Sequence, residues 1–110
     1  MIEKIICDYL TEHLSCTALP EKPKRPFDKA VFVEKTGGRG QFIIESTFAV
    51  QSYAQSLYDT IALNDEVIQA MYGLMELDSI VDVKLNSNYN FTDTTTKEYR
   101  YQAVFDVKHY

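Results

Sequence analysis

Residues 41–74, QFIIESTFAVQSYAQSLYDTIALNDEVIQAMYGL, change from one hydrophobic period to another, and this change decides the fold. In residues 41–50 the apolar side chains recur at every second position, namely Phe42, Ile44, Phe48 and Val50, and Ser46 alone interrupts the row. This period is typical of a strand that is buried on one face. Ser52 and Gln55 then match a capping box, which predicts that a helix begins here.

The helix predicted after Ser52 is amphipathic. Its apolar side chains share one face and comprise Leu57, Tyr58, Ile61, Ile68, Met71 and Met75. Gly73 is the expected C-terminal cap. Asn64 and Asp65 are good N-cap residues within the same stretch, so one kinked helix and two short helices are both compatible with the pattern.

A second amphipathic helix is predicted for residues 1–15. Its apolar positions are Ile2, Ile5, Ile6, Tyr9, Leu10 and Leu14, and Lys4 and Asp8 stand one turn apart on the other side. The three prolines Pro20, Pro23 and Pro26 exclude regular structure from the interior of residues 17–29. This segment is therefore expected to be a surface connection, with one short edge strand near residues 16–19.

Three further segments read as strands. Residues 30–36 are rich in β-branched and aromatic side chains, and the glycines of residues 37–40 predict a hairpin turn into the strand that begins at Gln41. Residues 79–86 and 99–107 alternate apolar and polar side chains, with Val81, Val83 and Leu85 facing the core in the first of them.

Together these elements predict one α+β domain spanning residues 1–110. We expect a two-layer sandwich in the order α-β-β-α-β-β, with a mainly antiparallel four-stranded sheet. Both helices would cover one face of the sheet, and the opposite face would be polar.

The composition limits the classes of function. A net charge of −5 and a pI near 4.9 argue against a protein that coats nucleic acid, because phosphate neutralisation needs clustered cations. The densest basic run, Lys22, Lys24 and Arg25, is expected to be a solvated loop. The sequence shows neither a signal peptide nor an apolar stretch of membrane-spanning length, which predicts synthesis in the cytoplasm and no membrane partner.

No catalytic, cofactor or metal motif is recognisable. Cys7, Cys16, His13 and His109 are not arranged at metal-ligand or redox spacings, and we expect them to be structural or surface residues. Residues 86–94 are rich in oxygen ligands but lack the glycine and the terminal glutamate of a calcium loop. They are expected to form a polar arm between two strands, which either contacts a partner protein or folds on its own sheet.

Several segments resemble small tail-terminator or tail-completion proteins of long-tailed phages and of Gram-positive prophages. The similar segments are Val33 to Gly38, Phe48 to Ala54, Lys84 to Asn86, Tyr89 to Asp93 and Tyr99 to Phe105. The resemblance implies a non-enzymatic structural protein that forms a ring, commonly a homohexamer, on the last ring of tail-tube subunits. Such a ring stops tube polymerisation and offers a docking face to the head connector.

The resemblance also implies the partners and the location. The partners would be further copies of the chain, the major tail tube protein and a head-closure or connector protein, while DNA passes through the ring without specific binding. The protein would act in the host cytoplasm during assembly and then in the tail or neck of the virion. The resemblance does not separate a terminator from other small neck proteins of the head-to-tail joint. A small cytosolic enzyme or ligand-binding domain, with its site between helices and sheet, is the rival from another class.

Six residues are the candidate protein contacts. They come from the predicted hairpin, the polar arm and the last strand: Lys35, Arg39, Tyr89, Phe91, Asp93 and Arg100. Replacing Phe91 by Ala is expected to preserve the fold and weaken assembly, because exposed aromatic side chains concentrate at interface cores.

Overall fold

The helices and strands are those of an α+β fold. The computed structural model describes residues 1–22, 24 and 26–110, so Pro23 and Arg25 of the predicted basic loop lie outside the described residues. The elements in chain order are α1 (Ile2–His13), β1 (Ala18–Leu19), β2 (Ala30–Gly40), β3 (Ile44–Tyr53), α2 (Leu57–Gly73), the 3-10 turn η1 (Leu74–Glu76), β4 (Ile80–Asn90) and β5 (Arg100–His109).

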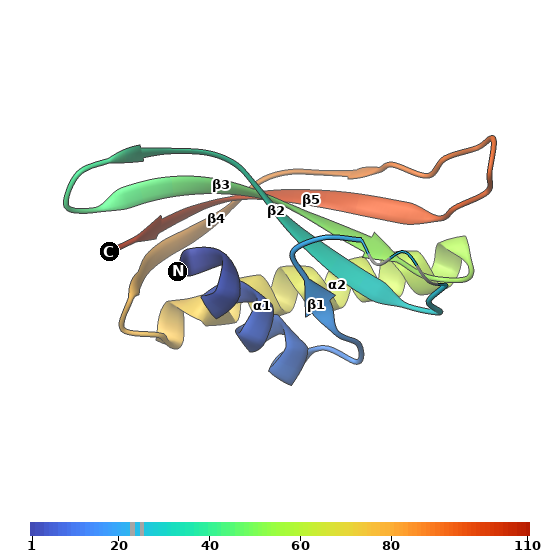
Figure 1. Ribbon diagram of the computed structural model, residues 1–110, viewed down its shortest axis with the longest axis horizontal. Coiled ribbons are helices and arrows are strands. Elements are labelled where there is room, and N and C mark those ends of the chain that lie inside the picture. The colour runs from blue at the N-terminus through green and yellow to red at the C-terminus, as the bar shows by residue number, and fades with distance from the viewer. Residues whose placement is uncertain (23, 25) are drawn as a thin grey trace.

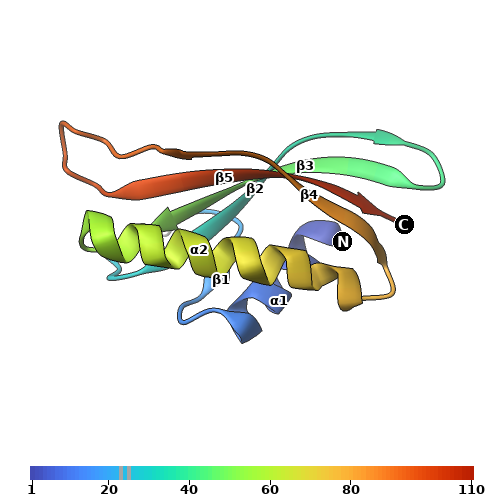
Figure 2. The same ribbon diagram turned by 180° about the vertical axis from the view of Figure 1, so that it is seen from behind.

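The strands form one mixed sheet in the order β1-β2-β3-β5-β4. All neighbouring pairs are antiparallel except β1 and β2, which are parallel. Both helices lie on the same side of this sheet (Figures 1 and 2), which confirms the predicted two-layer arrangement. The predicted count of four strands and the order α-β-β-α-β-β are wrong, because the short edge segment near residues 16–19 pairs with β2 as a fifth strand.

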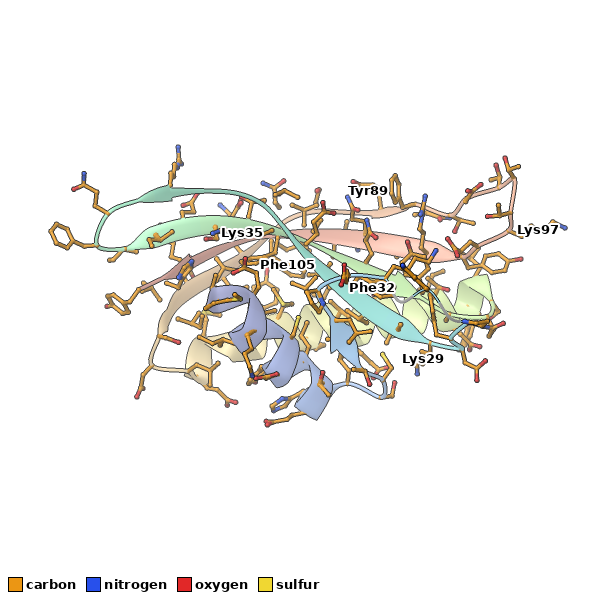
Figure 3. All side chains as sticks on the ribbon, in the orientation of Figure 1. Lys29, Phe32, Lys35, Tyr89, Lys97 and Phe105 are labelled. Atoms are coloured by element: carbon orange, nitrogen blue, oxygen red, sulfur yellow. The ribbon has the colours of Figure 1, made fainter. Side chains whose placement is uncertain are left out.

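The core fills the space between the sheet and the helices. Its largest fully buried side chains are Ile6, Leu10, Val31, Val33, Phe48, Val50, Leu63, Val67, Met71, Leu74, Phe105 and Val107. Phe105 points from the sheet towards the helices in Figure 3. Full burial of side chains of this size contributes about 1.5–3 kcal/mol each, so this layer supplies most of the driving force for folding.

A small aromatic cluster covers part of the other face of the sheet. Ala30, Phe32 and Tyr53 are buried together, and Phe27 packs on them edge to face at ring separations of 5.6 and 5.8 Å. Because alternate strand residues point to opposite faces, these side chains lie away from Val31 and the helices. The prediction that this face is polar is therefore wrong at the end where the loop containing Phe27 folds over it.

The junction between β3 and α2 lies further along the chain than predicted. Strand β3 continues through Ser52 to Tyr53, and α2 is capped by Ser56, whose Oγ accepts a hydrogen bond from the backbone N–H of Asp59 at 3.1 Å. Gln55 does not cap the helix, because its Nε2 donates to the carbonyl of Asp28 at 3.1 Å. The helix is continuous from Leu57 to Gly73, which excludes the alternative of two short helices.

The face of α2 that packs on the sheet also differs from the predicted one. The buried positions are Thr60, Leu63, Asn64, Val67 and Met71. Burial of the two polar residues is possible because Thr60 Oγ1 donates to Ser56 O at 2.7 Å and Asn64 Nδ2 donates to Asn88 Oδ1 at 2.8 Å. The helix is turned so that most of the predicted stripe, including Leu57, Tyr58, Ile61 and Met75, is exposed.

Gly73 is needed for close packing, and the predicted role as a C-terminal cap is wrong. The residue is the last of α2, and Leu74 in a right-handed conformation follows as the cap. A Cβ atom at position 73 would lie 2.5 Å from Tyr9 Oη. Tyr9 Oη in turn donates to Glu76 Oε1 at 2.9 Å, so the glycine lets α1 approach the end of α2.

Two hairpins extend the sheet at opposite ends of its long axis (Figure 1), and the described chain measures 43 × 24 × 24 Å. The β2–β3 turn comprises residues 41–43, because β2 continues through the glycines predicted to form the turn. Phe42 is consequently 89% exposed rather than part of the buried row. A bulge between Ile80 and Asp82 similarly leaves Val81 40% exposed, contrary to its predicted place in the core.

Candidate functional site

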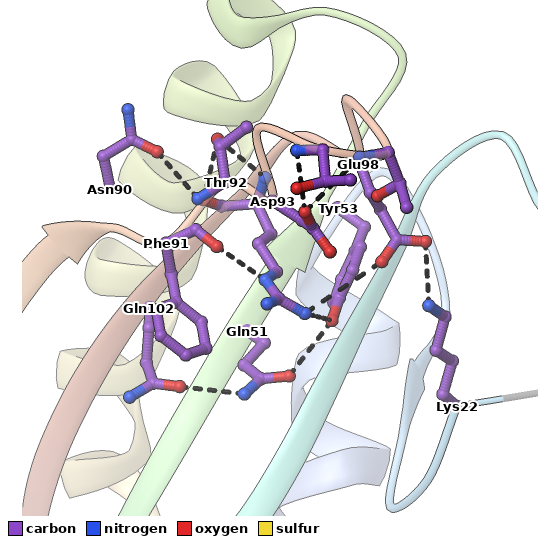
Figure 4. A network of polar contacts seen from close by, with 12 residues as sticks. Lys22, Gln51, Tyr53, Asn90, Phe91, Thr92, Asp93, Glu98 and Gln102 are labelled. Carbon is purple, nitrogen blue, oxygen red and sulfur yellow. Dashed lines mark hydrogen bonds and ion pairs between the residues drawn. The ribbon is translucent and has the colours of Figure 1, made fainter.

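Arg100 organises the hairpin between β4 and β5. Its Nε donates to the carbonyl of Phe91 at 2.6 Å and its Nη1 donates to Tyr53 Oη at 3.2 Å. The guanidinium carbon also lies 4.4 Å from the centre of the Phe91 ring, within the range of a cation–π contact. Strand β4 continues through Asn90, so the prediction that residues 86–90 belong to an arm between strands is wrong. The contacts of Arg100 tie Phe91, the first residue after β4, to the sheet (Figure 4), and a contact of this segment with a partner protein stays a prediction.

Polar side chains continue this network across the sheet. Tyr53 Oη donates to Gln51 Oε1 at 3.4 Å, and Gln51 Nε2 donates to Gln102 Oε1 at 2.8 Å. Gln102 Nε2 donates to Tyr89 Oη, and the Tyr89 ring lies edge-on to that of Phe91. Tyr89 points away from the helices in Figure 3. Strands β3, β4 and β5 and Phe91 are thus joined by one continuous set of side-chain contacts.

The turn of the arm is closed by Asp93. Its Oδ1 accepts hydrogen bonds from the backbone N–H groups of Thr95 at 2.9 Å and Thr96 at 3.3 Å. These two hydrogen bonds hold the pKa of the Asp93 carboxyl below its ordinary value. Glu98 pairs with Lys22 at 2.8 Å, which connects the arm to the loop that follows β1. Asp93 therefore shapes the turn, and its charge faces solvent.

The β2–β3 hairpin carries the other two candidate residues. Lys35 precedes a bulge in β2, and Arg39 Nη2 lies 3.4 Å from Glu45 Oε1 in an ion pair whose arginine side chain is 83% exposed. Gly40 has a φ of +118°, and a Cβ atom there would contact the carbonyl of Ile43. The structure therefore divides the six predicted residues between two ends: Tyr89, Phe91, Asp93 and Arg100 come together, whereas Lys35 and Arg39 lie apart from them.

The sequence prediction missed the tip of this hairpin. Phe42 is 89% exposed and Ile43 is 47% exposed, and neither belongs to the two apolar clusters. The signal was present in the sequence as an apolar pair directly after a glycine-rich run. It was overlooked because Phe42 stands in register with the buried positions of β3.

Both lateral edges of the sheet contain unpaired strand backbone within the described residues. Strand β4 pairs only with β5, and β1 covers β2 only at Val31 and Phe32. Beyond Phe32 the outer edge of β2 is uncovered by any described strand as far as Gly40. An uncovered edge presents a row of N–H and C=O groups that can pair with another chain.

A groove separates α1 from β1. It has a volume of about 590 Å³, and Cys7, Ala18 and Leu19 are among its lining residues. Burial raises the pKa of the Cys7 thiol. Glu3, Asp8 and Glu12 line the groove as well, together with Lys4, which pairs with Asp8 at 2.6 Å. The groove therefore combines an apolar part with an acidic rim.

A buried Ser46–His109 pair explains the interruption of the apolar row in β3. Ser46 Oγ and His109 Nε2 are 2.8 Å apart, and His109 Nδ1 lies 3.1 Å from the carbonyl of Tyr110. Serine next to histidine is also the arrangement of hydrolytic nucleophiles. Here Ser46 is 0% exposed and His109 is 5% exposed, so the pair acts as a satisfied polar contact within the core.

The remaining chemistry-bearing residues are dispersed. Within residues 1–22, 24 and 26–110, histidine, cysteine and carboxylate side chains form no group that could hold a metal ion. The layer between helices and sheet, where a ligand site was the rival expectation, is filled by fully buried side chains such as Phe48, Leu63 and Phe105. In the same described part of the chain, no helix is long and apolar enough to cross a membrane.

Comparison with models of known protein families gives no match, and comparison with curated proteins finds no relative.

Proposed function

We propose that this chain is a structural phage assembly protein, which joins with further copies into a ring at the head-proximal end of a tail tube. The ring ends tube polymerisation and links the tail to the head connector. In this proposal the protein acts in the host cytoplasm during assembly and then in the tail or neck of the virion, and it carries out no catalysis.

The observation that carries the proposal is the pair of different open edges on one sheet. The outer edge of β4 lies on one side, and the edge of β2 beyond Phe32 lies on the other. A surface that differs from its complement gives a head-to-tail contact, and head-to-tail contacts close into rings when the rotation between copies allows it. The two hairpins extend the same surfaces beyond the folded body.

The apolar surface of α2 supports the same conclusion. Leu57, Ile61 and Tyr72 lie on one side of α2 and are each 38–39% exposed, and Met75 of η1 is 45% exposed. Val81 of the neighbouring strand β4 is 40% exposed. Exposed apolar side chains of this size are typical of protein contacts when they gather on one surface. An acidic chain also suits a ring through which DNA passes without binding.

The mass of the protein in solution tests the proposal. We expect light scattering over a concentration series to reach a plateau at about six subunits, because a closed ring has no free end to grow from. A mass that rises without a plateau would indicate open polymers, and a constant monomer mass would show that the isolated chain does not form the ring.

Two further observations separate the tail terminator from its alternatives. Addition of the purified tail tube protein from the same genome should give a complex with a terminator, whereas another neck protein should bind the connector and leave the tube protein unbound. Genes for a tail tube protein and a head-closure protein beside this gene would agree with the proposal. A neighbourhood of metabolic genes would favour the enzyme or ligand-binding alternative.

A further inference from the structure

We propose that the tip of the β2–β3 hairpin of one copy docks in the groove between α1 and β1 of the next copy. This inference rests on the proposed function, because it names the surfaces through which successive copies of the ring would join. The tip is defined as residues 41–43, and the groove as the surface lined by Cys7, Ala18, Leu19 and the acidic residues of α1.

The hairpin has the shape and composition of an inserted element. It extends beyond the helices at one end of the sheet (Figure 1), and Phe42 at its turn is 89% exposed. Phenylalanine at such a position gains no stability from its own fold. An aromatic side chain of this kind is a typical anchor when it enters a pocket on a partner.

The groove has matching dimensions and polarity. Its volume of about 590 Å³ exceeds the space that one aromatic side chain needs, and Ala18 and Leu19 supply apolar lining. Thr11 Oγ1 accepts a hydrogen bond from the backbone N–H of Ala18 at 3.1 Å. The outer edge of β1 is therefore already partly satisfied, and the groove can accept an apolar side chain there without leaving that donor unpaired.

The charges of the two surfaces are complementary. Residues 35–44 contain two cations, Lys35 and Arg39, and no carboxylate, while Glu45, the next residue, forms an exposed ion pair with Arg39. The groove rim carries the carboxylates of Glu3, Asp8 and Glu12, of which Asp8 is paired with Lys4. Charge complementarity of this kind favours one docking orientation and raises the rate of association.

A second copy is the occupant that these surfaces fit best. One chain carries both the basic hairpin with an apolar tip and the acidic groove with an apolar lining. Because the two surfaces differ, each copy can donate its hairpin to one neighbour and accept a hairpin from the other. Such a contact repeats around a ring without using the same patch twice.

Cross-linking between mixed variants tests this contact directly. One sample carries Gln41→Cys beside the anchor Phe42, and the other carries Thr17→Cys at the groove, both in a chain with Cys7→Ala and Cys16→Ala, which removes the two native thiols. Mixing them with a short bifunctional thiol reagent should join the two variants covalently. The matched control replaces Gln41→Cys by Tyr58→Cys, which is similarly exposed at 80% but lies on α2, and should give at least tenfold less of the mixed product.

Charge exchange provides the second measurement. Arg39→Glu and Glu12→Lys should each weaken self-association by roughly tenfold, whereas the double variant should recover most of the loss because the attraction is restored with reversed signs. Both side chains are exposed, so neither change should unfold the chain. Recovery in the double variant would not follow from two independent effects on folding.

The outcomes distinguish the contact from the proposed function. A closed ring without the mixed cross-link, and with no recovery in the double variant, would overturn the hairpin contact and leave the ring proposal in place. A monomer at every concentration, again without cross-linking, would overturn both. A specific cross-link with recovery by the double variant supports the contact.

Discussion

The two hairpins of the sheet differ in how their side chains are used. In the β4–β5 hairpin, Arg100 hydrogen-bonds to Phe91 and Tyr53, and Asp93 closes the turn on Thr95 and Thr96. In residues 39–45 of the β2–β3 hairpin, the described contacts are the strand ladder and one exposed ion pair between Arg39 and Glu45. Side-chain hydrogen bonds stabilise the β4–β5 hairpin, whereas Arg39 and Phe42 of the β2–β3 hairpin are exposed to solvent.

This difference shows that exposure and charge alone do not identify a contact surface. The sequence marked Arg39, Phe91 and Arg100 as candidate contacts and placed Phe42 in a buried row. Arg100 lies over the ring of Phe91, which is 40% exposed, whereas Phe42 is 89% exposed and the Arg39 side chain is 83% exposed. Substitutions in the first hairpin should therefore change stability, and substitutions in the second should change association.

The largest difference in the free energy of unfolding is expected between alanine variants of Arg100 and Arg39. Arg100→Ala should lower the free energy of unfolding by about 2 kcal/mol, because two hydrogen bonds from a charged donor and a stacking contact are lost. Arg39→Ala should change it by less than about 0.5 kcal/mol, since exposed ion pairs contribute little. Urea unfolding of both variants measures this. Equal losses would contradict the division between a structural hairpin and an exposed one.

The second prediction concerns the turn geometry of the exposed hairpin. Gly40→Ala should cost about 1–2 kcal/mol, because φ is +118° and the new Cβ would press on the carbonyl of Ile43. Gly37→Ala is the matched control, since nothing lies within 4 Å of its added Cβ. Thermal unfolding and sizing by light scattering should show lost association only for the first variant. Identical behaviour of the two would mean that the hairpin shape is irrelevant.

The two phenylalanines give a smaller effect on stability. Phe91→Ala should destabilise the fold by about 1 kcal/mol through loss of its contacts with Arg100 and Tyr89. Phe42→Ala should leave stability within about 0.5 kcal/mol and weaken self-association, because the side chain contributes no packing to its own fold. The sequence-based expectation that Phe91→Ala weakens assembly stays a prediction, and sedimentation of both variants tests it. Stronger loss of association for Phe91→Ala would reverse the comparison.

The smallest effect is a pH dependence in the middle of the sheet. Asp106 accepts hydrogen bonds from Asn86 Nδ2 at 3.0 Å and Thr47 Oγ1 at 2.8 Å, and the Asn86 bond is the main cause of its lowered pKa. The folded pKa lies below the ordinary value of 3.8, so the contribution is present above that pH and is lost as the pH falls through the folded pKa. The loss should amount to tenths of a kcal/mol, since such groups are screened by solvent.

Asp106→Asn provides the control for this titration. The variant should show a flatter dependence of unfolding free energy on pH below about 4, with little change at neutral pH. If the dependence of the unfolding free energy on pH below about 4 is the same in the variant, other carboxylates dominate the titration.

Much of the fold followed from hydrophobic period alone. The helix of residues 2–13, the strands around residues 30–53 and the buried row Ala103, Phe105 and Val107 of β5 all match the pattern of apolar side chains. The rotation of α2 did not follow, because Thr60 and Asn64 are buried through hydrogen bonds that only the folded chain provides. The aromatic cluster around Phe27 was also missed, since its partners Phe32 and Tyr53 come from distant segments.

The candidate contact surface was predictable only in part. The sequence marked both hairpins as protruding, and the structure contains both. The sequence could not show that Arg100 contacts residues of its own hairpin, because the contacts with Tyr53 and Phe91 depend on strand register. The groove between α1 and β1 was invisible for the same reason, since it is formed by the pairing of a two-residue strand with β2.

The most direct test of the account compares the mass of the natural protein with that of Phe42→Ala over the same concentration series by light scattering. We expect a plateau at about six subunits for the natural protein and a shift to smaller species for the variant at equal concentration, because head-to-tail contacts close a ring only while the docking surface is intact. A monomer throughout the series, or an unchanged mass for Phe42→Ala, would contradict it.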